Sequence, residues 1–310
     1  MTPRTRLVFA GVCIVWGVPY LFIKIAVDGG VTPLSLAWAR VALGAIVLLG
    51  VAYRSGSLRG LAGRWRWIAA YGVVEIAIPL PLIAAGERHV TSSIAAIIIA
   101  AVPLLVALLA LRFDHAERAS GKRLAGLLTG LLGVVLLVGL DASGRLQALL
   151  GAGAILAAAC GYAAGPMILK RGLVDLDPRA AMGASLAVAA LVLTPLALLD
   201  LPARSPSTGA LASAVVLGLL CTAVGFVLMA VLVNDVGPGR AVVVTYINPV
   251  VAVALGMSLL GERPGAGALG GLLLILAGSW VATRSSSSGE RAPRQESIST
   301  APGNITPRIL

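Results

Sequence analysis

The chain is divided into apolar runs of about twenty residues, each separated from the next by a short polar connection. A helix of that length crosses the hydrocarbon core of a bilayer, which is roughly 30 Å thick. Because lipid offers the backbone no hydrogen-bond partners, only helices and closed barrels cross it, and these runs lack the alternation of barrel strands. The sequence therefore predicts an all-α polytopic membrane protein with ten transmembrane helices. The expected spans are residues 7–27, 33–52, 67–85, 92–111, 124–140, 146–169, 180–199, 210–233, 239–260 and 266–283.

Composition excludes a soluble domain, because 58% of the residues are hydrophobic and only 12% are charged. The formal net charge of +11 would suggest nucleic-acid binding in a soluble chain. Here the basic residues lie in short connections, as topology signals do, so no nucleic-acid partner is expected. Cys13, Cys160 and Cys221 lie inside apolar runs and are expected to pack rather than to form disulfides or bind metal. No metal and no cofactor are predicted.

Two stretches of the chain, residues 91–117 and 237–262, resemble each other. When Pro103 is aligned with Pro249, Glu117 falls within one residue of Glu262. This match predicts two halves, each ending in the same pair of helices.

Each predicted half contains five helices, an odd number, so the second half must enter the membrane from the opposite side. We therefore expect two inverted five-helix repeats, one over residues 1–145 and one over residues 146–284. Inverted repeats are typical of secondary transporters, whose binding site lies near the bilayer midplane between the repeats. Residues 285–310 are rich in serine, proline and charge, and we predict a disordered cytoplasmic tail there.

The distribution of basic residues predicts the orientation of the chain. Of the 24 lysine and arginine residues, only Arg88, Arg145, Arg204 and Arg263 fall in one of the two sets of connections, while Lys24 and Arg40 lie within apolar runs. The set that contains most basic residues also contains both termini. Basic connections stay on the cytoplasmic side, so we expect both termini in the cytoplasm and the connections that contain Arg88, Arg145, Arg204 and Arg263 outside.

Several short motifs occur in a characteristic order. They are Trp16-Gly17, then Arg40, then Pro103 followed by Glu117, and finally Asn248-Pro249 followed by Gly261-Glu262. In this order they resemble the EamA-type members of the drug/metabolite transporter superfamily, over residues 7–283. The resemblance implies a multi-pass carrier of the bacterial inner membrane, usually an exporter of amino acids, metabolites or drugs. It also implies a small-molecule substrate and a cavity between two helix bundles.

Arg40 and Glu75 are the charged residues expected deepest in the bilayer, on neighbouring antiparallel helices. In one interpretation Arg40 binds an anionic group of the substrate, or Glu75 carries a coupling proton. In the other, the two residues neutralise each other as a buried structural pair. We expect them to touch in at least one state. Lys24 is expected to reach the membrane interface.

Polar-edged side chains at membrane depth are further candidates for the substrate site, because a mostly apolar pocket needs a few orienting groups. Trp16 and Tyr20 lie in the first apolar run. Tyr246 and Asn248 immediately precede Pro249, where a weakened helix would turn them inward. We predict that these four residues contact the substrate together with Arg40 and Glu75.

Two further aromatic residues, Tyr71 and Tyr162, fit a packing role equally well. Pro103 and Pro249 are predicted to act as hinges, because proline removes a backbone donor and weakens the helix before it.

Glycines spaced four residues apart occur in the fifth and tenth expected helices. They are Gly126 and Gly130 in the fifth, and Gly267 and Gly271 in the tenth. Such faces permit close helix contact. Packing within one chain is the first expectation, and a homodimer seam through helices five and ten is the alternative.

Two other classes of function remain as alternatives. His89 and His115 lie in connections on opposite sides of the membrane, and the sequence has no zinc-protease, nucleophile-elbow or phosphate-loop motif. An enzyme is therefore not expected. The alternatives to a transporter are a membrane-embedded enzyme acting on a lipid-linked substrate and a structural membrane protein that transports nothing.

Overall fold

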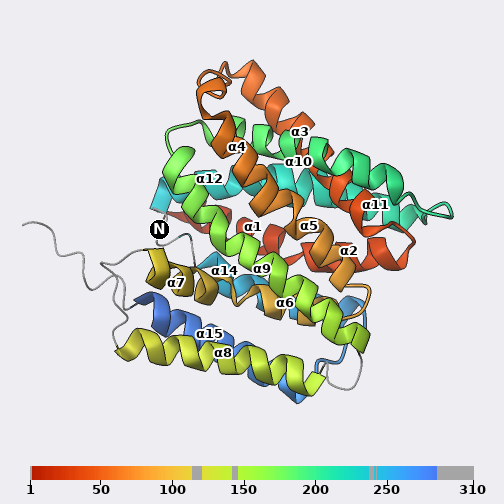
Figure 1. Ribbon diagram of the computed structural model, residues 1–310, viewed down its shortest axis with the longest axis vertical. Coiled ribbons are helices and arrows are strands. Elements are labelled where there is room, and N and C mark those ends of the chain that lie inside the picture. Colours follow the sequence, from red (N-terminus) through yellow and green to blue (C-terminus); the bar gives the residue numbers. More distant parts are fainter. Residues whose placement is uncertain (1, 114–120, 142–145, 237–240, 242, 285–310) are drawn as a thin grey trace, which may run out of the picture.

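The computed structural model describes residues 2–113, 121–141, 146–236, 241 and 243–284. Glu117, His115 and the predicted tail of residues 285–310 lie outside the described residues. Within the described part of the chain, all regular secondary structure is helical. Most helices run across the page in Figure 1, and the N-terminus lies at its left.

Seven helical stretches are long and apolar enough to cross a membrane, and three shorter apolar helices complete the ten expected spans. The long stretches are Pro3–Asp28, Pro33–Arg54, Ala62–Gly86, Ser92–Leu109, Leu146–Gly172, Pro178–Leu199 and Thr208–Val236. The shorter ones are Leu124–Gly139, Val244–Leu259 and Ala266–Ala282. The prediction of an all-helical multi-pass membrane protein is confirmed.

The elements of the first half are α1 (Pro3–Gly17), α2 (Pro19–Asp28), α3 (Pro33–Arg54), η1 (Ala62–Arg64), α4 (Trp65–Tyr71), η2 (Gly72–Ala77), α5 (Pro79–Gly86), α6 (Ser92–Ile99), α7 (Val102–Phe113) and α8 (Gly121–Asp141). Those of the second half are α9 (Leu146–Gly172), α10 (Pro178–Leu199), α11 (Thr208–Val216), η3 (Leu217–Val224), α12 (Gly225–Val236), α14 (Val244–Leu259) and α15 (Ala266–Arg284). A single span is therefore often built from several elements.

Hydroxyl and carboxylate side chains begin many of these helices. Thr32, Thr91 and Ser207 each accept a hydrogen bond from the backbone N–H three residues on. This satisfies a donor that the first helical turn leaves open. Pro33 follows its cap directly, at the position where a missing N–H is harmless.

The third and eighth spans contain matching interruptions. Gly72–Ala77 (η2) and Leu217–Val224 (η3) are both π-helical, and each lies in the middle of its span. Such segments are rare in long form and often occur at functional sites. Their presence at corresponding places in the two halves shows that the repeat extends to local backbone geometry.

The two halves pack against each other through antiparallel pairs of equivalent spans. In one pair, Gly126 of α8 lies beside Gly278 of α15, while Gly133 lies beside Gly271. A Cβ atom on Gly133 would come within 2.8 Å of the Gly271 carbonyl oxygen. These glycine faces therefore pack within the chain, as first expected, and are not free to form the alternative dimer seam. Figure 1 shows α8 and α15 side by side at the bottom of the view.

The second pair is α3 with α10, near the top of Figure 1. The indole Nε1 of Trp38, near the start of α3, donates to Thr194 Oγ1, near the end of α10, at 3.0 Å. Gly183, near the start of α10, lies against Leu48 in the second half of α3. The opposite directions of equivalent spans are those that inverted repeats require.

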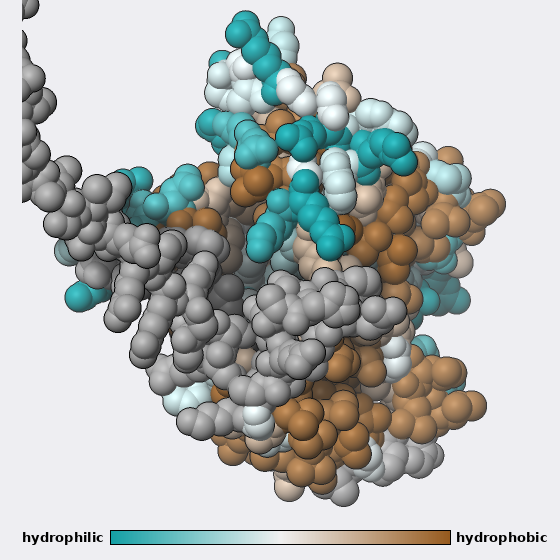
Figure 2. Space-filling view, turned by 60° about the vertical axis from the view of Figure 1, so that its left-hand side comes forward, coloured by the Kyte–Doolittle hydropathy of each residue, from teal (hydrophilic) through white to brown (hydrophobic). Residues whose placement is uncertain are grey.

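The helix ends at the left of Figure 1 come forward in Figure 2, where hydrophilic residues gather in the upper part and hydrophobic ones below and to the right. Basic residues are exposed at this end, and they include Arg54, Arg59, Arg66, Lys170 and Arg171. We call the opposite end, which holds residues 29–32, 87–91, 200–207 and 260–265, the outer end, after the expected orientation.

Candidate functional site

Arg40 is held by the π-helical segment of the eighth span. Its Nε atom donates to Thr222 Oγ1 at 2.8 Å, and the Thr222 hydroxyl donates to the Leu217 carbonyl oxygen at 2.8 Å. Gly218 allows the backbones to approach, because a Cβ there would lie 3.2 Å from the Arg40 carbonyl oxygen. No described residue pairs with the two terminal nitrogens of the guanidinium, which leaves them available to an anionic group.

Glu75 lies in η2, at the corresponding place in the third span. Its carboxylate rests on Gly165 of α9, where any side chain would collide with it. Its Oε2 atom is buried and has no hydrogen-bond partner among the described residues. The expected ion pair with Arg40 is not formed in this conformation, because the Arg40 Nε is committed to Thr222 and no described cation pairs with Glu75. The carboxylate is therefore left without a cationic partner among the described residues.

Tyr162 of α9 lies within electrostatic range of both Arg40 and Glu75. Tyr20 of α2 lies within range of Arg40 and Tyr162. Tyr71 lies within range of Glu75 and Tyr162 but is buried in a hydrophobic cluster. We call Tyr20, Arg40, Glu75, Tyr162 and Thr222 the central polar cluster. It combines side chains from both repeats.

Sequence patterns gave no preference for Tyr162 over a packing role. The repeat gives a signal that could have found it, because the offset that aligns Pro103 with Pro249 also aligns Trp16 with Tyr162.

The remaining predicted site residues lie around the junction of α1 and α14. Trp16 packs edge-on against Phe226, with ring centroids 6.0 Å apart. Tyr246 is half-buried on α14. The Asn248 amide, oriented so that its donors are satisfied, donates to the Cys13 and Val244 carbonyl oxygens at 3.3 and 3.0 Å. Asn248 thus ties α14 to α1.

The two predicted hinge prolines differ in their surroundings. Pro103 is the second residue of α7 and follows a break at Ala100 and Ala101, which separates α6 from α7. Pro249 lies inside α14, whose helix continues on both sides of it. A further break separates α1 from α2 at Val18, directly before Pro19.

The outer end is tied together across the two repeats. Glu262 accepts hydrogen bonds from the backbone of Ser92 and Ser93 at 2.8 and 3.0 Å, and from the Ser93 hydroxyl at 2.5 Å. Its carboxylate thereby caps α6, where the positive end of the helix dipole favours it. The Ser207 N–H donates to the Gly29 carbonyl oxygen at 3.0 Å. We call this conformation, in which these contacts join the two repeats, closed at the outer end.

Sequence reasoning missed one acid, Glu87, which directly follows the third span. Its side chain is wholly buried, with an exposed fraction of 0%. The segment Gly86 to Val90 is short and polar, so it looks like an exposed turn. The neighbouring sequence does not predict that Glu87 is buried, because the residues that cover it come from elsewhere in the chain.

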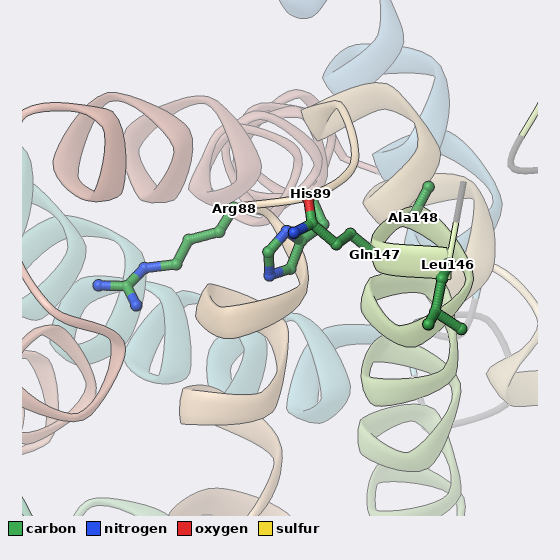
Figure 3. A pocket seen from close by; sticks show the side chains of 5 residues that line it. All are labelled: Arg88, His89, Leu146, Gln147 and Ala148. Carbon is green, nitrogen blue, oxygen red and sulfur yellow. The ribbon is translucent and has the colours of Figure 1, made fainter.

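A surface pocket of about 370 Å³ lies beside this turn, between Arg88 and His89 on one side and Leu146, Gln147 and Ala148 at the start of α9 on the other. Figure 3 shows the Arg88 side chain pointing away from the other four residues. The pocket lies at the outer end, apart from the central polar cluster. We therefore do not assign it to substrate binding at the midplane.

The chain has recognisable relatives. A family model described as the EamA-like transporter family matches it twice, over residues 5–139 and over residues 149–284. A solved structure, described only as the crystal structure of a protein, aligns with a TM-score of 0.65 and 20% identity. That alignment covers 94% of this chain and 100% of the other, and at such identity the likeness concerns the fold alone. No curated protein matches the chain.

Proposed function

The chain belongs to the EamA-like transporter family and is thus a secondary transporter; on that premise we propose that it exports a small metabolite, amino acid or drug across the bacterial inner membrane by alternating access. Both termini lie in the cytoplasm in this proposal, which is supported by the excess of basic residues at that end. The bilayer and the small-molecule substrate are its partners, and no catalytic step is needed.

One observation carries the proposal: the central polar cluster places two ionisable side chains with unpaired polar atoms inside an apolar helix bundle. Charges at such depth are expensive and are retained where they serve a pathway or a site. The terminal nitrogens of Arg40 and the Oε2 atom of Glu75 have no partner among the described residues. Arg40 would bind a carboxylate or phosphate of the substrate, Glu75 a cationic group, and the two phenols would hydrogen-bond between them.

Alternating access requires one end of the bundle to open while the other closes. The outer end is held by Glu262 and by the contact of Ser207 with Gly29. The breaks at Val18 and at Ala100, with the π-helical segments in the third and eighth spans, supply places where the helices can bend. This supports the hinge role of Pro103 more directly than that of Pro249.

Flux into proteoliposomes tests the proposal and separates it from the enzyme and structural alternatives. Purified protein would be reconstituted with a panel of labelled amino acids, metabolites and cationic drugs under an imposed pH gradient. We expect at least one solute to exchange faster than in protein-free vesicles. Replacing Arg40→Gln should abolish most of that flux, whereas Arg64→Gln, at an exposed site of the cytoplasmic end, should not. Flux that is equal in both variants would reject Arg40 as a substrate-binding residue.

A further inference from the structure

Glu87 is the described acid whose environment is least explained by packing or pairing. It follows Gly86, the last residue of the third span, and its side chain is fully buried. Neither carboxyl oxygen has a hydrogen-bond donor among the described residues. Glu262, at the same end of the molecule, accepts three hydrogen bonds, so burial at this end does not by itself leave a carboxylate without donors.

The nearest cation does not neutralise Glu87. The Lys24 ammonium donates to the backbone carbonyl oxygen of Glu87 at 2.8 Å and pairs with Asp28 at 3.2 Å. Its interactions are therefore directed at the Glu87 backbone and at another carboxylate. This arrangement fixes the position of Glu87 without satisfying its side chain.

Other charged and titratable groups face Glu87 from each element around it. Tyr20 and Asp28 approach from α2, Arg40 from α3, and Glu262 from the segment after α14. On the α9 side, Gly86 packs against Gly151 and Ile155, which carry no charge. The two nearby carboxylates disfavour a further negative charge at this place.

An ionised carboxylate is expensive to bury without donors, and a neutral carboxyl is much less so. Burial therefore raises the pKa of Glu87 well above its ordinary value, while Lys24 acts in the opposite direction and Glu262 and Asp28 raise the pKa further. Burial without donors thus favours the neutral carboxyl in the conformation described.

We propose that Glu87 is a proton-binding site of the outer end, which takes its proton from the outer solution and holds it while the outer end is closed. The two residues that follow it, Arg88 and His89, line the surface pocket of Figure 3, so the outer solution reaches the neighbouring positions of the chain. Opening of the outer end would hydrate the carboxyl and allow the proton to leave. The bound proton thus favours closure.

The direction of the pH effect follows from the difference in the pKa of Glu87 between the closed and the open form. The pKa is raised in the closed form relative to a hydrated, open form, so closure is favoured most fully below the hydrated pKa. As pH rises from that value to the raised one, the ratio of closed to open forms falls by up to about tenfold per pH unit. The effect of Glu87 on transport rests on the proposed alternating access. Proton binding and closure themselves can be measured without a substrate.

The first readout is the carbonyl stretch of a protonated carboxyl in infrared spectra of the purified protein near neutral pH. We expect a band that Glu87→Gln removes and that Asp175→Asn, at an exposed acid of the opposite end, leaves in place. Glu75→Gln, measured in parallel, identifies any band from the central cluster. A wild-type spectrum that Glu87→Gln leaves unchanged would overturn the proposal.

The second readout is the accessibility of a thiol at Ala210, which is fully buried against Gly29 at the closed outer end. The labelling rate of Ala210→Cys by an impermeant reagent would be divided by that of Leu201→Cys, an exposed position of the same end, to remove the pH dependence of thiol chemistry. We expect the ratio to rise with pH in the otherwise wild-type chain and with Asp175→Asn. With Glu87→Gln, which mimics the protonated acid, it should stay low at every pH. The same rise with and without Glu87→Gln would contradict a proton-controlled closure, whatever the flux measurements show.

Discussion

At the scale of single residues, the central polar cluster depends on glycine as much as on its charged members. The Glu75 carboxylate occupies space that a side chain on Gly165 would fill. Arg40 similarly approaches the eighth span where Gly218 leaves room. Two charges are thus brought into one bundle because small residues of other spans admit them.

Gly165→Ala should therefore lower transport per molecule by about tenfold or more, because misplacing a binding group by roughly 1 Å has effects up to about 100-fold. The measurement is flux normalised to the amount of protein in the membrane. Gly153→Ala is the matched control, since the same helix leaves open space around Gly153. If the two variants transport equally well, Glu75 does not need its position on Gly165 to support transport.

Residue-scale reasoning from sequence found the charges but not their partners. Arg40 and Glu75 were correctly placed within spans, yet Arg40 bonds to Thr222, which is 182 positions away. Glu87 was missed because Lys24, 63 positions away, holds it from another span. Contacts of this kind depend on how the spans assemble, and short sequence patterns do not predict them.

At the scale of secondary-structure elements, the chain was far more predictable. Hydrophobic length placed all ten spans to within a few residues, because the thickness of the bilayer fixes how long an apolar helix must be. Glycine spacing in the fifth and tenth spans correctly indicated close helix packing within the chain, but not that these two helices pack on each other. The π-helical segments were not foreseen, because nothing in the composition of residues 72–77 or 217–224 distinguishes them from ordinary helix.

The contact of α8 with α15 makes a prediction at this scale. Gly133→Ala should destabilise the fold by about 1–3 kcal/mol, because the added methyl group meets the backbone of α15, which cannot move aside easily. Thermal unfolding of the purified protein measures this effect as a lower Tm. Gly139→Ala, on the same helix with open space around it, should leave the Tm unchanged or raise it slightly. An equal Tm for both variants would show that the helices can separate at little cost.

At the scale of the whole molecule, the inverted arrangement explains why so many features occur twice. Equivalent spans pair antiparallel, equivalent spans carry π-helical segments, and side chains from both halves meet at the central polar cluster. The proposed alternating access uses this symmetry, with one conformation open to each side. The structure described is closed at the outer end.

The central claim is that the polar cluster faces each side of the membrane in turn, and Tyr162 is the residue that tests it. In a chain with Cys13, Cys160 and Cys221 replaced by serine, Tyr162→Cys would be exposed to an impermeant thiol reagent from one side of the membrane at a time. Leu191→Cys, on the exposed apolar surface of α10, serves as the control that aqueous reagents should not reach.

We predict that the thiol at position 162 reacts from both sides, and that a transported solute changes the two rates in opposite directions. Reaction from one side only, with no response to any solute that the protein transports, would contradict alternating access to this cluster.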